Sequence, residues 1–137
     1  MPEPGSATSK AKRESLAPQF VVRDVVEAAE YYRDTFGFRI LGYWQDPPCY
    51  AIVARDSVRI HFGDLTKGDV APNSVRRPGG LDAYIWTDNV DTLFEELRGR
   101  GAKIVEQPCR QEYGTYEMVV EDKFGFRLAF GMNAPEK

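Results

Sequence analysis

The chain has 137 residues and a net charge of −3, with 42% hydrophobic and 28% charged residues. This length predicts one domain, and the composition is typical of a globular protein. Lysine and arginine are scattered along the chain. We therefore expect no basic surface that would bind nucleic acid or an anionic membrane.

Cysteine and histidine are scarce, with Cys49, Cys109 and His61 as the complete set. The absence of a CxxC pair excludes the common zinc-binding spacings and argues against a disulfide framework, so both thiols are expected to be reduced. No apolar run approaches the ~20 residues that a membrane span needs, and the N-terminus lacks the apolar core of a signal peptide. These features predict a cytoplasmic protein.

The first 15 residues are rich in proline, glycine, serine and charge and contain almost nothing apolar. This composition predicts a disordered tail over residues 1–15. The remaining residues, 16–137, are predicted to form a single domain.

The first half of that domain predicts the order β-α-β-β-β. Asp24 is a candidate N-cap for a helix over 25–36 whose apolar residues share one face, and Gly37 occupies the position where helices often end. Strands are expected at residues 19–23, 38–44, 50–54 and 59–63.

The second half predicts the same order after a polar, glycine- and proline-rich linker over residues 65–80. Asp88 or Asn89 is expected to cap a helix that carries Val90 and Leu97 on its apolar face. Strands are expected at residues 82–87, 102–106, 116–121 and 127–131.

A five-residue motif occurs once in each half, at Arg59–Gly63 and at Arg127–Gly131. In both copies a basic residue is followed by an aliphatic residue, a variable residue, phenylalanine and glycine. The final glycine is expected to end each strand. They differ in chemistry mainly where His61 becomes Ala129. Further pairs repeat at nearly the same offset, so we predict a duplication with repeats at residues 16–64 and 81–131.

Several short sequences occur at equivalent places in this duplicated pattern: Phe20–Val25, Tyr31–Tyr32, Phe36–Phe38, Trp86–Asp91 and Glu121–Asp122 before Gly125. In this order they resemble the vicinal-oxygen-chelate superfamily of glyoxalase I, bleomycin-resistance proteins and extradiol dioxygenases. The resemblance covers residues 16–131. It implies an α+β fold in which two βαβββ units in tandem form curved mixed sheets around a cup, with the helices outside. Because units of that superfamily commonly pair between chains, it also implies a homodimer.

The resemblance further implies four positions at which metal-dependent members place their ligands. In this sequence these positions are Ala17, His61, Asp82 and Ala129. Alanine cannot coordinate a metal, and a catalytic metal centre usually has three protein ligands. The resemblance therefore favours the bleomycin-resistance-like branch without a cofactor, with His61 and Asp82 as weak candidate ligands of one divalent ion.

If His61 and Asp82 face the cup, residues two positions apart on the same strands face it too. The resulting ligand-binding candidates are Gln19, Trp44, Arg59, His61, Asp82, Tyr84, Trp86, Tyr113 and Arg127, with Trp44 and Tyr113 near turns that could close over the ligand. Aromatic faces with a few polar groups predict a flat, aromatic or cationic small-molecule ligand. Each candidate also has a purely structural interpretation: ordinary sheet residues, surface ion pairs for the arginines, a turn carboxylate for Asp82.

Together these features predict a metal-independent binding protein for a drug or metabolite. The alternative is an enzyme (lyase, isomerase or dioxygenase) in which His61 and Asp82 are catalytic, either through a divalent metal or as an acid–base pair. A purely structural or partner-binding domain is a third hypothesis, because a fold does not determine a function.

Overall fold

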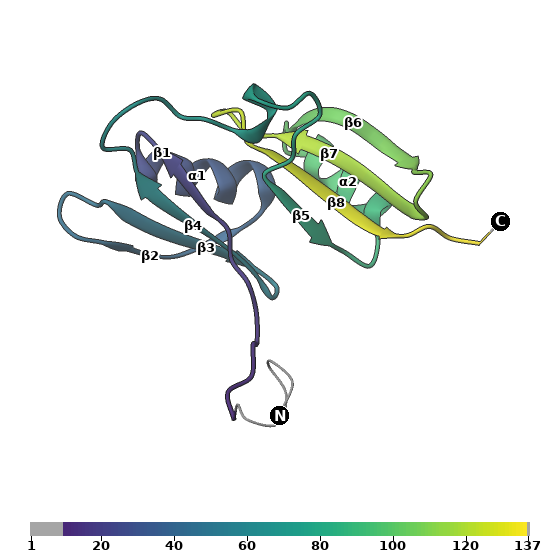
Figure 1. The fold of residues 1–137 in the computed structure, drawn as a ribbon, viewed down its shortest axis with the longest axis horizontal. Coiled ribbons are helices and arrows are strands. Elements are labelled where there is room, and N and C mark those ends of the chain that lie inside the picture. The colour runs from purple at the N-terminus through teal and green to yellow at the C-terminus, as the bar shows by residue number, and fades with distance from the viewer. Residues whose placement is uncertain (1–9, 137) are drawn as a thin grey trace, which may run out of the picture.

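The computed structural model describes residues 10–136, which form two βαβββ units (Figure 1). The first nine residues of the predicted tail lie outside this range, and residues 10–15 contain neither helix nor strand. The elements of the first unit are β1 Gln19–Val22, α1 Val25–Phe36, β2 Arg39–Trp44, β3 Tyr50–Arg55 and β4 Val58–Asp64. Those of the second are β5 Ala83–Trp86, α2 Val90–Gly99, β6 Lys103–Arg110, β7 Thr115–Glu121 and β8 Arg127–Asn133.

Each unit contains one four-stranded mixed sheet, and the two sheets have the same topology. Their strand orders are β1-β4-β3-β2 and β5-β8-β7-β6. The first strand of each unit pairs in parallel with the last, and the other pairs are antiparallel. The predicted α+β class and the duplication of βαβββ units are confirmed.

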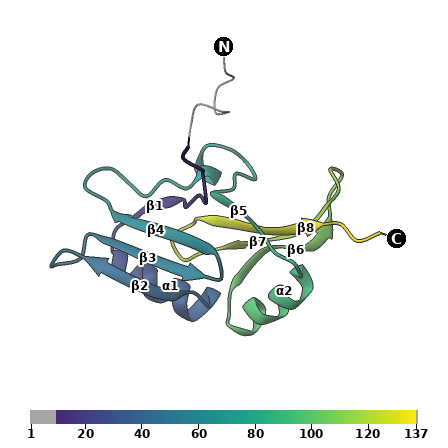
Figure 2. The same cartoon turned by 90° about the horizontal axis from the view of Figure 1, so that it is seen from below.

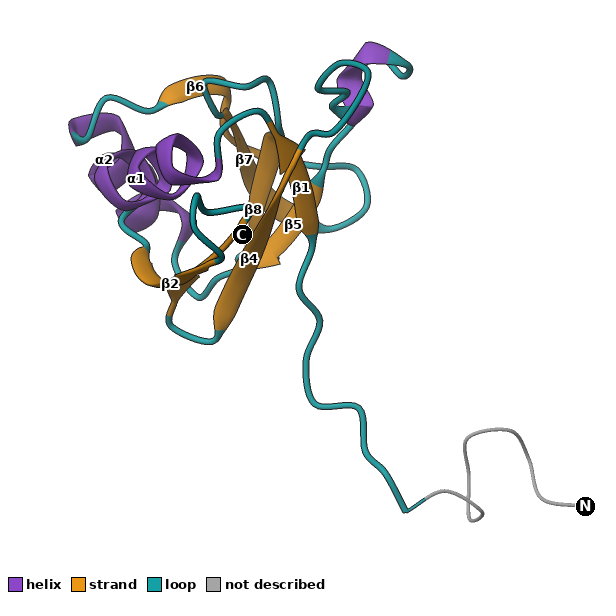
Figure 3. Cartoon of the chain, turned by 90° about the vertical axis from the view of Figure 1, so that its left-hand side faces the viewer, coloured by secondary structure: helices purple, strands orange, loops and turns teal. Residues whose placement is uncertain are grey.

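Both helices lie on the same side of the sheets, and the opposite faces of the sheets are open (Figures 2 and 3). Helix α1 begins where the Asp24 side chain accepts hydrogen bonds from the N–H groups of Val26 and Glu27. It ends at Gly37, which has a left-handed backbone with φ of 77°. Both ends of this helix agree with the sequence prediction.

The two units share one hydrophobic core. The rings of Phe20 on β1 and Phe126, just before β8, stack with centroids 4.5 Å apart. The hydroxyl of Tyr32 on α1 donates to Oδ2 of Asp122 in the β7–β8 turn at 2.7 Å. The open faces of the two sheets are therefore held in a fixed arrangement within one body.

Some predicted boundaries were wrong. Gly63 and Gly131 lie inside β4 and β8 and do not end these strands. Strand β6 continues past Pro108 to Arg110, because it is an edge strand with register shifts and so tolerates a residue that cannot donate to the ladder. The linker contains a 3₁₀ turn at Asn73–Val75.

Cys49 and Cys109 are free and half-buried. Among residues 10–136, no helix has the length and hydropathy that crossing a membrane demands.

Candidate functional site

The open face of the second sheet carries a buried carboxylate covered by two tyrosines. Glu117 on β7 is only 4% exposed. Its Oε2 accepts hydrogen bonds from the hydroxyls of Tyr84 at 2.5 Å and Thr115 at 3.1 Å. Its Oε1 accepts a hydrogen bond from the hydroxyl of Tyr113 at 2.5 Å. We call Tyr84, Tyr113, Thr115 and Glu117 the carboxylate cluster.

Trp86 lies beside the carboxylate cluster. Its ring centroid is 5.2 Å from that of Tyr84, and the residue is 62% exposed. Burial and the hydrogen bond to Glu117 raise the pKa of Tyr84 to about 12, so this phenol is protonated at neutral pH. The second sheet therefore offers an exposed aromatic surface next to hydrogen-bonding oxygens.

Gly131 makes the Tyr84–Glu117 hydrogen bond possible. In the sheet register Gly131 on β8 pairs with Trp86 on one side and with Glu117 on the other. The Tyr84 phenol passes over Gly131, where a Cβ atom would be 2.6 Å from its Cζ. The glycine that the sequence analysis interpreted as a strand end thus leaves room for a side chain to cross from β5 to β7.

On the open face of the first sheet, hydrogen bonds link three side chains in a row. Gln19 on β1 donates from Nε2 to the Tyr50 hydroxyl at 2.9 Å, and that hydroxyl lies 2.8 Å from Nδ1 of His61. The Tyr50 ring also lies between the ring of His61, at 5.5 Å, and that of Trp44, at 6.4 Å. Four side chains from four strands therefore meet on this face.

The Tyr50 hydroxyl fixes the orientation of the imidazole. Its oxygen accepts from Gln19 and is hydrogen-bonded to Nδ1 of His61. Which of the two atoms, the phenol oxygen or Nδ1, donates in the second bond depends on the tautomer of the ring. The bond in either direction holds the His61 ring in place on the open face.

The two faces are built on the same plan. In each unit a side chain from the first strand passes over the glycine of the repeated motif and reaches the third strand. Gln19 reaches Tyr50 beside Gly63, and Tyr84 reaches Glu117 beside Gly131. The sequence analysis included neither Tyr50 nor Glu117 among its site residues. Their equivalent positions in the two repeats were the signal that could have identified both.

Asp82 has a different environment from the one predicted. Its Oδ1 accepts from the backbone N–H of Asn73 and its Oδ2 from that of Arg127, both at 2.9 Å. The carboxylate thus joins the linker to the start of β8, as the turn-carboxylate interpretation has it. No hydrogen bond connects Asp82 with His61 among the described residues.

The four superfamily metal positions do not suit a metal ion in this chain. Ala17 and Ala129 have no donor atom, and both Asp82 oxygens accept backbone hydrogen bonds, which leaves His61 alone of the four. Within residues 10–136 no three or more His, Cys, Asp or Glu side chains are grouped as metal ligands would be.

The predicted arginines differ in their surroundings. Arg127 donates from Nε to Glu121 at 3.0 Å, and Lys103 pairs with the same carboxylate at 2.6 Å. Arg59 on β4 is exposed. Arg127 therefore shares one acidic partner with Lys103 on its own sheet.

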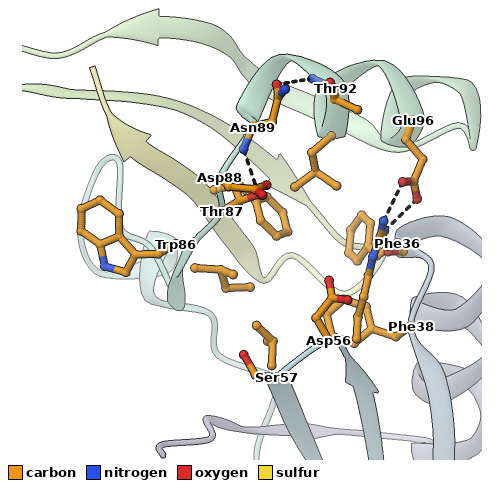
Figure 4. A pocket seen from close by; sticks show the side chains of 15 residues that line it. Phe36, Phe38, Asp56, Ser57, Trp86, Thr87, Asp88, Asn89, Thr92 and Glu96 are labelled. Carbon is orange, nitrogen blue, oxygen red and sulfur yellow. Dashed lines mark hydrogen bonds and ion pairs between the residues drawn. The ribbon is translucent and has the colours of Figure 1, made fainter. Parts of the chain in front are cut away.

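Two hollows lie near the predicted residues. A groove of about 370 Å³ between the units has an apolar floor that includes Phe36 and Phe130, and of the predicted site residues only Trp86 lines it. Figure 4 shows Thr87 and Asp88 on one side of this groove and Asp56 and Ser57 on the other. A second hollow of about 460 Å³ between β1 and the linker is lined by Gln19 and Asp82, among others.

Comparison with known protein families decides the classification. The family model of the Glyoxalase/Bleomycin resistance protein/Dioxygenase superfamily matches residues 16–130. The chain belongs to this superfamily. The resemblance inferred from the sequence is thereby confirmed. No match was found among curated proteins.

Solved structures of this superfamily's fold are similar over nearly the whole chain. TioX from Micromonospora sp. ML1 has a TM-score of 0.72 and 17% identity, covering 89% of this chain and 100% of its own. A bleomycin resistance determinant encoded on the transposon Tn5 has a TM-score of 0.70 and 17% identity, covering 90% and 100%. The bleomycin-binding protein from Streptomyces verticillus, in complex with copper(II)-bleomycin, has a TM-score of 0.66 and 21% identity, covering 92% and 99%.

Proposed function

We propose that this chain binds a flat small molecule, a drug or metabolite, on its aromatic sheet faces without using a metal ion. The observation that carries this proposal is the exposed indole of Trp86 packed beside Tyr84 on an open sheet face. Trp44 and Tyr50 make a second aromatic pair on the other sheet. Exposed aromatic surfaces with a few fixed polar groups are typical of sites for flat ligands.

We also propose that two copies form a homodimer in which the first sheet of one chain faces the second sheet of the other. In a single chain Trp44 is 47% exposed and Tyr113 is 69% exposed, so neither face is covered. Pairing the faces would enclose a ligand between two aromatic walls and remove apolar surface from water. Sedimentation analysis would then give twice the mass of the chain, and a monomer at micromolar concentration would contradict this part of the proposal.

Copper(II)-bleomycin is a suitable first ligand, because one protein of the same fold is a bleomycin-binding protein. Titration calorimetry should give saturable binding, and Trp86→Ala should raise the Kd about tenfold or more, as for an aromatic anchor at the centre of a site. Tyr43→Ala is the matched control. Tyr43 is an exposed aromatic on β2 of the first sheet, and its electrostatic neighbours Glu30 and Arg33 belong to α1. An equal loss in both variants, or no binding of this drug or of any flat compound in a panel, would contradict the proposal.

One observation favours an acid–base enzyme as a second candidate. The hydrogen bond between Tyr50 and Nδ1 holds the His61 ring in one orientation, which is what a proton-transferring imidazole requires. In that case turnover of a bound compound should fall at least about a hundredfold in His61→Ala while binding persists. Unchanged turnover in that variant would rule out this candidate.

A further inference from the structure

The carboxylate cluster fixes the direction of two phenol protons. Glu117 is buried and accepts three O–H groups. A phenol has one proton, and Tyr84 and Tyr113 both donate to this carboxyl group, so both protons are directed inward to it. The outward lone pairs of these two phenol oxygens are then acceptors and cannot donate.

These two oxygens are also richer in negative charge than those of isolated tyrosines. A hydrogen bond to a charged acceptor polarises the phenol, and chains of hydrogen bonds strengthen one another in a buried setting. Both bonds to Glu117 measure 2.5 Å. The residues of the pair remain open to solvent, Tyr84 at 36% and Tyr113 at 69%.

Two basic side chains of this sheet have an acidic partner of their own. Arg127 is paired with Glu121, and Lys103 is paired with the same carboxylate. The exposed ring of Trp86 lies next to Tyr84 and offers a face on which a flat cation can stack. Two acceptor oxygens and an indole face thus lie together on the second sheet.

We propose that Tyr84, Tyr113 and Glu117 form a recognition site for the N–H donors of a flat aromatic cation, such as an amidinium or guanidinium group, with Trp86 as its stacking surface. This inference rests on the proposed small-molecule binding, and it places the cationic group of the ligand on the second sheet.

Benzamidinium and benzamide are the probes that test this proposal. They have the same flat shape, but only benzamidinium is charged and offers donors from both of its nitrogens. Binding is followed by the fluorescence of Trp86 in a Trp44→Phe background, which leaves Trp86 as the only indole of the chain. We expect benzamidinium to bind about tenfold more tightly than benzamide, in line with the strength of cation–π and charge-assisted contacts.

Glu117→Gln is the decisive variant. An amide donates from its nitrogen, so at least one of the three hydroxyls must become an acceptor within the cluster and turn its proton away. The preference for benzamidinium should then fall several-fold, to what stacking of the cation on Trp86 alone supplies. Glu95→Gln is the control for the charge lost, because Glu95 lies on α2 and pairs with Arg98 away from this face, and it should keep the wild-type preference. Tyr113→Phe gives an independent check in case Glu117→Gln perturbs the fold, and it should also reduce the preference.

The outcomes separate this inference from the proposed function. Equal binding of the two probes by wild-type protein, or a preference that survives both Glu117→Gln and Tyr113→Phe, would overturn the cation site while leaving flat-ligand binding in place. If neither probe binds and copper(II)-bleomycin does not bind either, both proposals fail. A preference for benzamidinium over benzamide that is reduced in Glu117→Gln and unchanged in Glu95→Gln supports the site.

Discussion

Gly63 and Gly131 occupy equivalent places in the two units, but the space above them is filled to different extents. At Gly131 a Cβ atom would be 2.6 Å from Cζ of Tyr84, whereas at Gly63 the nearest atoms, from Gln19 and Tyr50, are 3.7 and 3.8 Å away. Neither glycine has a positive φ, so the backbone accepts a larger residue at both sites. Only the contact with Tyr84 makes Gly131 irreplaceable.

Gly131→Ala should therefore displace the Tyr84 phenol and lower the free energy of unfolding by about 1 to 3 kcal/mol, because Glu117 loses a hydrogen bond in a buried position. In a Tyr84→Ala background the same glycine substitution should be neutral or slightly stabilising, since the clash is gone and the unfolded chain is restricted. Gly63→Ala is the matched control and should cost less than about 0.5 kcal/mol. Urea denaturation gives the free energy of unfolding of wild type and of these four variants. If Gly131→Ala lowers that free energy equally with and without Tyr84, this explanation is contradicted.

At the same scale, part of the candidate site was predictable from the sequence. Period-2 alternation from Asp82 placed Tyr84 and Trp86 on one face of their strand, and in the structure the alternate residues Ala83 and Ile85 pack against the core. It gave no account of Asp82, because the two backbone donors of this carboxylate come from the linker and from β8. The path of an irregular linker is not encoded in any periodicity.

At the scale of elements, the helices were predictable because their ends depend on local chemistry. Asn89 caps α2 by accepting from the N–H of Thr92, as Asp24 caps α1. The strands were less well bounded, since their ends depend on partners distant in sequence. Pro108 illustrates this, because whether a proline ends a strand depends on whether that strand lies at the edge of its sheet.

Arg55 at the end of β3 connects elements of the two units. One of its amino groups donates to the carbonyl of Phe36 at 2.9 Å and to Glu96 on α2 at 2.7 Å, and the other donates to Glu96 at 2.6 Å. The hydrogen bonds from Arg55 hold the pKa of Glu96 below its ordinary value. One guanidinium thus connects the last turn of α1 with α2.

Arg55→Lys keeps the charge but cannot reproduce this planar, two-pronged geometry. We expect it to lower the free energy of unfolding by about 1 to 2 kcal/mol, as for loss of charge-assisted hydrogen bonds in a partly buried place. Arg98→Lys is the control, because Arg98 pairs with Glu95 at the exposed surface and such pairs contribute about 0 to 1 kcal/mol. Thermal or urea denaturation compares the two, and an equally small effect of both would show that Arg55 does not join the units energetically.

At the scale of the whole molecule, the two units are fused through a contact that contains a buried acid. Asp122 is 3% exposed. Its Oδ1 accepts from the backbone N–H groups of Phe124 and Phe126, and its Oδ2 accepts from Tyr32 of the other unit. Desolvation nevertheless raises the pKa of Asp122 from 3.8 to about 6. The junction between the units therefore binds a proton more readily than the unfolded chain does.

This raised pKa determines the sign of a pH effect on stability. The contribution of Asp122 to the free energy of unfolding is complete below about pH 3.8 and is lost as the pH rises through about 6. Asp122→Asn keeps both backbone acceptor bonds through its carbonyl oxygen, and its amide can donate to the Tyr32 oxygen, but it does not titrate. Relative to wild type, the variant should therefore gain about 2 to 3 kcal/mol between pH 4 and pH 7.

Urea denaturation of wild type and Asp122→Asn at several pH values between 4 and 7.5 measures this difference. Carboxylates such as Glu96 and Glu121, whose pKa values are lowered by their basic partners, change stability in the opposite direction with pH. They are common to both proteins and cancel when one curve is subtracted from the other. A difference that stays constant with pH would mean that Asp122 has already lost its proton at pH 4. The hydrogen bonds from Tyr32, Phe124 and Phe126 would then outweigh the desolvation of the carboxylate, and the junction would be an ionic contact at all pH values tested.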